Sequence, residues 1–323
     1  MEDMRDIFDV ITFGSATKDI FLRLKKEEFK LKSGFISFPI GAKIFIEEIN
    51  TATGGGGTNT AATFSNLGFK TAYCGKVGDD EEGEVIEKEL EKFKIFKFLK
   101  KDKKHPTAIS IVLSSAFFKR TILIYRGACH FLRKKDIPFG KLKAKWFYIG
   151  PLSGESAKIF PILINFAKNH NIKVMANLGN SQIALGKRVL KPILSKIDIL
   201  LLNQNEASLL AKTLNSKKLF SLTKGIIIIT KEKKGSLIFD GKYIFKAETL
   251  KTKVIDKTGA GDAYGSGFLA GILEKNNIEY AMKLATANAS KCLTKLGAKN
   301  GLLKKGDKWQ KAKVIKTVDE NYS

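Results

Sequence analysis

Short runs of apolar residues alternate with amphipathic segments along the second half of the chain. The runs "WFYIG", "KVMANLG" and "DILLLN" are each followed by a segment whose apolar residues recur with a helical period, as in "SAKIFPILINFAKNHN". The run "GIIIIT" is apolar nearly throughout, which is typical of a strand in a parallel sheet covered on both faces. The pattern predicts an α/β fold with a doubly wound, mostly parallel sheet.

Two segments in the first half of the chain interrupt this alternation. Residues 15–50 and 107–126 contain strand-like runs such as "TAISIVLSS" and "RTILIYRG", which are typical of a two-faced sheet. Neither segment is long enough for an independent domain. We therefore expect a single domain over residues 1–323, in which these two segments form a small antiparallel β lid over one end of the body.

Local patterns predict a helix and a hairpin and leave the C-terminus without an element. A helix is expected over residues 59–67, after the glycines of "TGGGGTN", and a hairpin over residues 235–248. The last residues, 314–323, are expected to be frayed because they are polar and terminal.

The composition is that of a globular protein that needs no disulfide bonds or structural metal ions to fold. The chain has 323 residues, of which 44% are hydrophobic, and can bury a large core. Cys74, Cys129 and Cys292 lie far apart and form no CxxC motif, so neither a disulfide framework nor a zinc ribbon is expected. The N-terminal "MEDMRDIFDV" lacks the apolar core of a signal peptide, and no run of eighteen apolar residues occurs. We expect a cytoplasmic protein with no membrane partner.

The strong positive charge does not by itself identify a ligand. Lys and Arg number 57 against 32 Asp and Glu, a net charge of +25. Such an excess could serve nucleic acid or anionic substrates. However, the lysines are scattered along the chain and no nucleic-acid motif accompanies them. We therefore expect a small-molecule partner rather than nucleic acid.

Polar and glycine-rich segments follow several of the predicted strands. They are "GSATKD" (14–19), "GGGGTN" (54–59), "NQNE" (203–206) with "TKEKKG" (230–235), and "GAGD" (259–262). Ligands of open α/β sheets bind beyond the carboxyl ends of the strands. We expect these segments to meet at one site.

The segment "GAGD" carries the most specific chemistry. Its glycines precede a predicted helix, whose first N–H groups have no internal acceptor and can hold a phosphate. Asp262 in that first turn could orient a hydroxyl and accept its proton. Gly267 and Gly271, four residues apart, would let the helix lie close against the sheet. A glycine turn with an aspartate helix cap explains "GAGD" equally well when it is taken alone.

Together the segments resemble the ribokinase-like (PfkB) carbohydrate kinase family. "DKTGAGDAYGSGFLAG" is similar to that family's C-terminal signature, and "GGGGTNTAATFSNLG" with "GKVGDDEEG" is similar to its N-terminal signature. "NQNE" matches its N-x-x-E motif, and the resemblance extends from Asp19 to Gly301. Lys257 departs from the signature, which usually has threonine there.

The resemblance implies roles for residues on the substrate side. Asp262 matches the catalytic base, and Gly259, Ala260 and Gly261 match the anion hole around the transferred phosphoryl group. The residues implied to bind the sugar hydroxyls are Asp19, Gly55, Gly56 and Asn59. Without the resemblance, Asp19 is equally a turn residue and Asn59 equally a helix cap.

The resemblance also implies a nucleotide site and two metal ions. The residues implied to bind ATP are Asn203, Thr230, Gly235 and Asn288, with Thr286 as an alternative to the last. Glu206 would hold Mg²⁺ through water, although Asn203 and Glu206 also fit a capping box at a helix start. Asp256 and Thr258 match positions beside the K⁺ ion of many members, with Gly297 and Gly301 close to others.

The expected activity is ATP-dependent phosphorylation of a hydroxymethyl group of a sugar. A nucleoside kinase is the alternative within the family, and a non-catalytic sugar-sensing or nucleic-acid-binding protein is the alternative outside it. Arg120 and Arg126 could reach a phosphate from the lid, whereas the isolated His105 and His130 do not suggest a metal site. Unpaired lid edges lead us to expect a homodimer through the lid.

Overall fold

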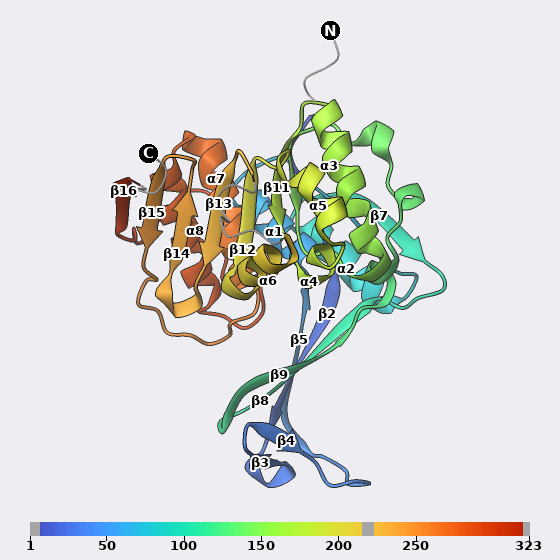
Figure 1. The fold of residues 1–323 in the computed structure, drawn as a ribbon. Coiled ribbons are helices and arrows are strands. Elements are labelled where there is room, and N and C mark those ends of the chain that lie inside the picture. The colour runs from blue at the N-terminus through green and yellow to red at the C-terminus, as the bar shows by residue number, and fades with distance from the viewer. Residues whose placement is uncertain (1–6, 215–222, 319–323) are drawn as a thin grey trace.

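The computed structural model describes residues 7–214 and 223–318, and its centre is a ten-stranded sheet (Figure 1). From one edge to the other the strands are β16 (Val314–Val318), β15 (Tyr243–Ala247), β14 (Ser236–Phe239), β13 (Ile226–Thr230), β12 (Ile199–Asn203), β11 (Lys173–Asn177), β10 (Ala144–Ile149), β1 (Phe8–Phe13), β6 (Thr71–Gly78) and β7 (Phe96–Asp102). All neighbours from β13 to β7 are parallel, and β14, β15 and β16 extend the sheet in antiparallel fashion.

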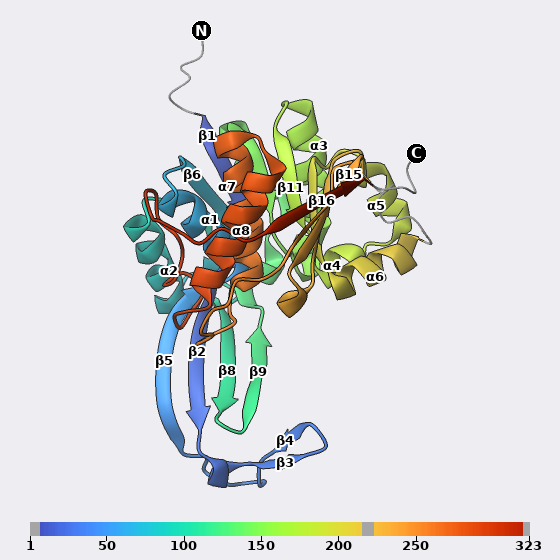
Figure 2. The same cartoon turned by 90° about the vertical axis from the view of Figure 1, so that its left-hand side faces the viewer.

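Helices cover both faces of this sheet, as Figure 2 shows from the side. One face packs against α3 (Phe160–Asn169), α4 (Asn180–Ile183), α5 (Lys187–Leu194) and α6 (Gln204–Leu214). The other packs against α1 (Gly56–Asn66), α2 (Glu81–Lys92), α7 (Ala260–Lys275) and α8 (Ile278–Cys292). The predicted doubly wound, mostly parallel α/β fold is therefore confirmed. Within the described ranges, no helix has both the length and the apolar character needed to cross a membrane.

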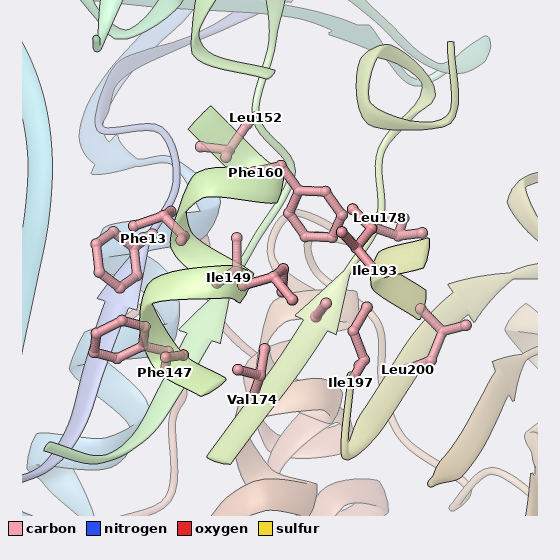
Figure 3. Close-up of a cluster of buried hydrophobic side chains, with 14 of the residues drawn as sticks. Phe13, Phe147, Ile149, Leu152, Phe160, Val174, Leu178, Ile193, Ile197 and Leu200 are labelled. Carbon is pink, nitrogen blue, oxygen red and sulfur yellow. The ribbon is translucent and has the colours of Figure 1, made fainter. Parts of the chain in front are cut away.

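The core on the α3 side explains why the strand sequences are continuously apolar (Figure 3). Phe147 and Ile149 of β10 share one apolar cluster with Phe160 of α3, and Phe13 of β1 lies beside Phe147 with ring centroids 4.9 Å apart. Because the alternate residues of the same strands face α7 and α8, both faces of each strand must be apolar.

The lid is a second, four-stranded sheet that projects from one end of the body (Figures 1 and 2). Its order is β5 (Ile46–Gly54), β2 (Thr17–Leu24), β8 (Ala108–Ser115) and β9 (Phe118–Tyr125). The two outer pairs are antiparallel, as expected, whereas the central pair of β2 and β8 is parallel. A short hairpin of β3 (Lys30–Lys32) and β4 (Phe35–Ser37) lies at its far end.

The structure corrects the expected role of two helix glycines. A Cβ on Gly271 would overlap the Cα of Ala281, and one on Gly267 would lie 3.0 Å from the Cα of Ala285. Both alanines belong to α8, so these glycines admit the neighbouring helix and not the sheet. Gly265 is the glycine that faces the sheet, where a Cβ would overlap the hydroxyl of Tyr148.

Two predicted boundaries also change. The helix expected from residue 59 begins at Gly56, so the glycine segment itself forms the first turn of α1. The C-terminal residues 314–323 are not frayed throughout, because Val314–Val318 form β16 on the open edge of β15. Residues 319–323 lie outside the described part of the chain. The predicted hairpin is confirmed as β14 and β15.

Candidate active site

The glycine segment 54–59 connects the lid to the body and forms the floor of the site. Gly55 has φ +96°, and a Cβ there would overlap the carbonyl of Ser15. Only glycine fits such a position without strain. The chain then enters α1, and the Ser15 hydroxyl accepts a hydrogen bond from the N–H of Gly56 at 3.2 Å. The start of α1 is thereby held against the strand that precedes the lid.

Asp262 lies in the first turn of α7 and faces this segment. Gly259 adopts φ +76° and the helix begins at Ala260, so the N–H groups of the following residues have no intrahelical acceptor. The amide Nδ2 of Asn59 donates to Asp262 Oδ2 at 2.9 Å, across 203 residues of sequence. A Cβ on Gly56 would lie 3.3 Å from Asp262 Oδ1. The structure therefore brings together the predicted base, anion hole and two predicted substrate residues.

The surroundings of Asp262 make it a stronger base than a solvated carboxylate. Burial raises its pKa, and the hydrogen bond from Asn59 and the charge of Lys299 offset part of that effect. A raised pKa brings a carboxylate closer to the range in which a general base works near neutral pH. Asn59 Oδ1 is buried and has no partner among the described residues, which leaves it free to accept a hydroxyl.

Asp19 lies on the other side of the glycine segment. It is buried on β2 and accepts a hydrogen bond from the Thr17 hydroxyl at 3.0 Å. Its other carboxylate oxygen occupies the space that a side chain at Gly54 would need. Burial raises the pKa of Asp19 to about 6. The glycine segment thus holds one carboxylate at each end, Asp19 at Gly54 and Asp262 at Asn59.

A buried lysine that sequence reasoning missed lies at the root of the lid. Lys299 is only 6% exposed, and its Nζ donates to Thr53 Oγ1 and to Glu89 Oε2, each at 2.6 Å. Its positive charge acts on both Asp19 and Asp262. The preceding Ala298 packs against Gly259 of the anion hole. Nothing in the local sequence distinguishes this lysine from the many surface ones.

The side chains of Asp256 and Thr258 are already engaged by the protein. Asp256 Oδ1 accepts bonds from the N–H and hydroxyl of Thr258 at 3.0 and 2.8 Å, and Oδ2 accepts the N–H of Gly297 at 3.0 Å. Arg120 of the lid contacts both side chains. These bonds engage the side-chain oxygens, and the expectation that Asp256 and Thr258 lie beside a K⁺ ion stays a prediction. Within the described ranges, no group of three or more His, Cys, Asp or Glu could hold a metal ion.

The N-x-x-E residues form a reciprocal cap at the start of α6. The N–H of Asn203 donates to Glu206 Oε2 at 2.8 Å, and the N–H of Glu206 donates to Asn203 Oδ1 at 2.9 Å. Burial raises the pKa of Glu206. A single carboxylate beside a helix start suits Mg²⁺, which keeps most of its water.

The other nucleotide candidates differ in how they are placed. Thr230 ends β13, directly beside Asn203 in the register, and Gly235 has φ +79° with the carbonyl of Ala247 where its Cβ would be. Asn288 is fully buried, and its amide bonds the carbonyl of Ala263 at 2.8 Å and the N–H of Leu303 at 2.9 Å. Its amide thus joins α7, α8 and the C-terminal segment, and the Thr286 hydroxyl is likewise bonded within its helix.

A cavity of about 440 Å³ lies under the lid, beyond Asp19. Phe21 and Asn50 are paired in the register two residues along from Asp19, so they lie on the same face of the lid. Val112 pairs with Phe21 on that face, and Ile255 forms part of the opposite wall. The cavity lies two residues along β2 from Asp19, but the predicted substrate residues are not among those that line it. Its lining also includes the charged side chains of Arg23, Glu48 and Lys257.

Comparison with known proteins agrees with the fold. The model of the pfkB family carbohydrate kinases matches residues 14–305. An ATP-dependent 6-phosphofructokinase of Thermoanaerobacterium thermosaccharolyticum is 25% identical over 258 residues, which cover 76% of this chain and 80% of that protein. The nucleoside kinase of Methanocaldococcus jannaschii superposes with a TM-score of 0.76 at 22% identity, covering 92% of this chain and 95% of that one. Arabidopsis thaliana ribokinase, solved with ribose and ATP, gives a TM-score of 0.75 at 22% identity, with coverages of 92% and 96%.

Proposed function

The chain belongs to the pfkB family of carbohydrate kinases, and on this premise we propose that it transfers the terminal phosphoryl group of ATP to a hydroxymethyl oxygen of a sugar. The observation that carries this proposal is the hydrogen bond between Asn59 and Asp262 beside the free N–H groups of the anion hole. A base, a substrate-binding amide and a phosphate-binding helix start are held within one side chain's reach.

The proposed reaction is an in-line displacement. The hydroxymethyl oxygen bonds to the γ-phosphorus as the bond from that phosphorus to the bridging oxygen of ADP breaks, and Asp262 accepts the hydroxyl proton. The N–H groups of Gly259, Ala260 and Gly261 stabilise the charge on the phosphoryl oxygens. Asp19 and Asn59 hold the other sugar hydroxyls, so that the reacting oxygen points at Asp262.

The nucleotide would lie toward the ends of β12 and β13. We propose that it contacts Asn203, Thr230 and Gly235. The strands β12 and β13 are parallel neighbours, so the loops that follow them leave the sheet at the same edge. Glu206 would hold Mg²⁺ through water, and the ion when bound would neutralise charge on the nucleotide phosphates. Asn288, whose amide is used within the core, is not part of this proposal.

Sugar-dependent release of ADP tests the proposal. The purified protein is supplied with ATP and Mg²⁺ and a panel of sugars and nucleosides, and ADP is measured with and without each acceptor. Asp262→Asn should lower kcat by at least about 100-fold with little change in sugar affinity. Asp240→Asn is the matched control, because an asparagine can keep the turn bonds of Asp240 to the N–H groups of Lys242 and Tyr243. Near-normal turnover by Asp262→Asn would refute the assigned base, and ligand binding without ADP release across the panel would favour a sugar sensor.

One observation favours a nucleoside as the acceptor. The cavity beyond Asp19 has a volume of about 440 Å³, within the range of pockets for whole drug-sized ligands, which run from about 300 to 1,000 Å³. A base joined to the sugar could lie between Phe21 and Ile255 and bond the amide of Asn50. Purine nucleosides and furanose hexoses should therefore be compared directly. Asn50→Ala should reduce kcat/KM for a nucleoside and spare that for a hexose.

The outer face of the lid supports a homodimer. Ile49 and Leu123 lie on the side opposite to the cavity and are 63% and 51% exposed, whereas Lys18 on that side is paired with Glu82. Ile20 and Ile111 lie between them in the same sheet. An apolar patch of this kind is complementary to a second copy of itself about a two-fold axis. Sedimentation should give a dimer, and Leu123→Lys should give a monomer; a monomeric wild-type protein would exclude this arrangement.

A further inference from the structure

One arginine of the lid reaches across to the loop that leads into the anion hole. Arg120 Nη1 donates to Thr258 Oγ1 at 2.9 Å and lies 3.4 Å from Asp256 Oδ1. These contacts join residues that are 138 and 136 positions apart in sequence. The Asp256 side chain is 8% exposed and that of Arg120 is 31% exposed, so the pair is shielded from water on the loop side.

The lid strand is built irregularly at this point. The register between β8 and β9 shifts between Leu113 and Ser115, so that one residue of β8 lies opposite two of β9, Arg120 among them. Such a bulge turns a side chain out of the regular alternation of a strand. Arg120 lies on the cavity side of the lid, as does Ile122, which pairs with Val112, and its guanidinium group meets the body there.

The loop that receives Arg120 is the support of the anion hole. Thr258 immediately precedes Gly259, whose left-handed conformation begins α7. Asp256 ties this loop to a second one, because its Oδ2 accepts the N–H of Gly297. The neighbouring Ala298 packs against Gly259. The guanidinium therefore contacts Thr258 and Asp256, which link the predicted phosphate-binding turn at Gly259 to the loop around Gly297.

We propose that Arg120 is a positioning residue that couples closure of the lid to the conformation of the anion hole. This role rests on the proposed kinase function. With the lid in the observed position, Arg120 holds Thr258 and Asp256, and the N–H groups of residues 259–261 keep the orientation that phosphoryl transfer needs. When the lid opens, the bonds to Thr258 and Asp256 are lost and the turn relaxes. Arg120 also lines the cavity under the lid, so the same movement opens the substrate site.

Asp256 makes a direct role in anion binding less suitable for this arginine. Its carboxylate already neutralises the guanidinium, whereas a residue that binds a substrate phosphate needs its charge free. The two roles differ in kinetics. Loss of a positioning residue lowers kcat, because the anion hole acts in the transition state, whereas loss of a substrate contact raises KM.

The test compares Arg120→Ala, Arg120→Met and Arg120→Lys with Arg188→Met, which removes an exposed arginine of α5. We expect Arg120→Met to lower kcat about 10- to 100-fold with KM for the sugar changed less than about threefold. Arg120→Lys should retain part of the activity, because it keeps the charge and loses the planar fork. Millimolar guanidinium should restore Arg120→Ala, and urea at the same concentration should not. The control should behave as wild type.

A second measurement does not depend on turnover. Hydrogen exchange of peptides covering residues 256–261 should be faster in Arg120→Ala than in wild type and unchanged in Arg188→Met. An active wild type whose Arg120 variants keep normal kcat, or lose activity only through KM, overturns the proposal. Equal exchange in all proteins overturns it as well. If the wild type releases no ADP with any acceptor, the proposed kinase function is refuted. The exchange rates of residues 256–261 then test on their own whether Arg120 stabilises this loop.

Discussion

The buried carboxyl group of Asp19 should make stability and activity respond to pH in opposite directions. Burial raises its pKa from 3.8 to about 6, with Thr17 and the charge of Lys299 opposing the shift. One pKa unit corresponds to about 1.4 kcal/mol, so the shift is worth about 3 kcal/mol. The folded protein binds the proton more tightly than the unfolded chain. This stabilisation is therefore complete below about pH 4 and is lost as the pH rises through about 6.

Urea unfolding of wild type and Asp19→Asn at pH 4 and pH 8 measures this contribution. The neutral amide keeps the shape of the side chain and cannot ionise. The free energy of unfolding of the variant, relative to wild type, should rise by up to about 3 kcal/mol between the two pH values. Asp262 and Glu206 titrate in both proteins, whereas Lys299 is coupled to Asp19, so the difference reports Asp19 together with that coupling.

The same proton should have the opposite effect on catalysis. An ionised Asp19 accepts hydrogen bonds from sugar hydroxyls, so kcat/KM of wild type should fall as the pH drops through about 6. In Asp19→Asn the activity should be low, and the fall of kcat/KM near pH 6 should be absent. A stability difference that is the same at pH 4 and pH 8 would show that Asp19 is not held in a desolvated site.

Two further substitutions test the electrostatics and the packing around the site. Lys299→Met removes a charge that lowers the pKa of Asp262, so the acidic limb of kcat/KM should move to higher pH, and an unchanged midpoint would contradict the coupling. Gly271→Ala places a methyl group against the Cα of Ala281 and should lower the free energy of unfolding by about 1–3 kcal/mol. Gly140→Ala, where the added methyl has no atom within 4 Å, is its control in thermal and urea unfolding and should be close to neutral.

The contacts that complete the site depended on the tertiary structure. Asn59 and Asp262 are 203 residues apart, and only the packing of α1 beside α7 brings the amide to the carboxylate. Lys299 has nothing in its local sequence that separates it from the surface lysines, because burial is a property of the surfaces that pack around a residue. Asn288 was expected at the nucleotide from the resemblance to the family, and its position along the helix did not reveal that its amide bonds Ala263 and Leu303.

The features that arise from local physics were predictable from the sequence. Continuous apolar runs indicate strands with two covered faces. Gly259 has φ +76° and precedes the first residue of α7. Asn203 and Glu206 cap α6 within three residues. Each depends on backbone conformation or on neighbours along the chain. Three other contacts depend on the fold alone. They are the packing of Gly271 against α8, the bonds of Arg120 to Thr258 and Asp256, and the bonds that already engage the Asp256 carboxylate. These contacts join segments whose distance in space has no relation to their distance in sequence.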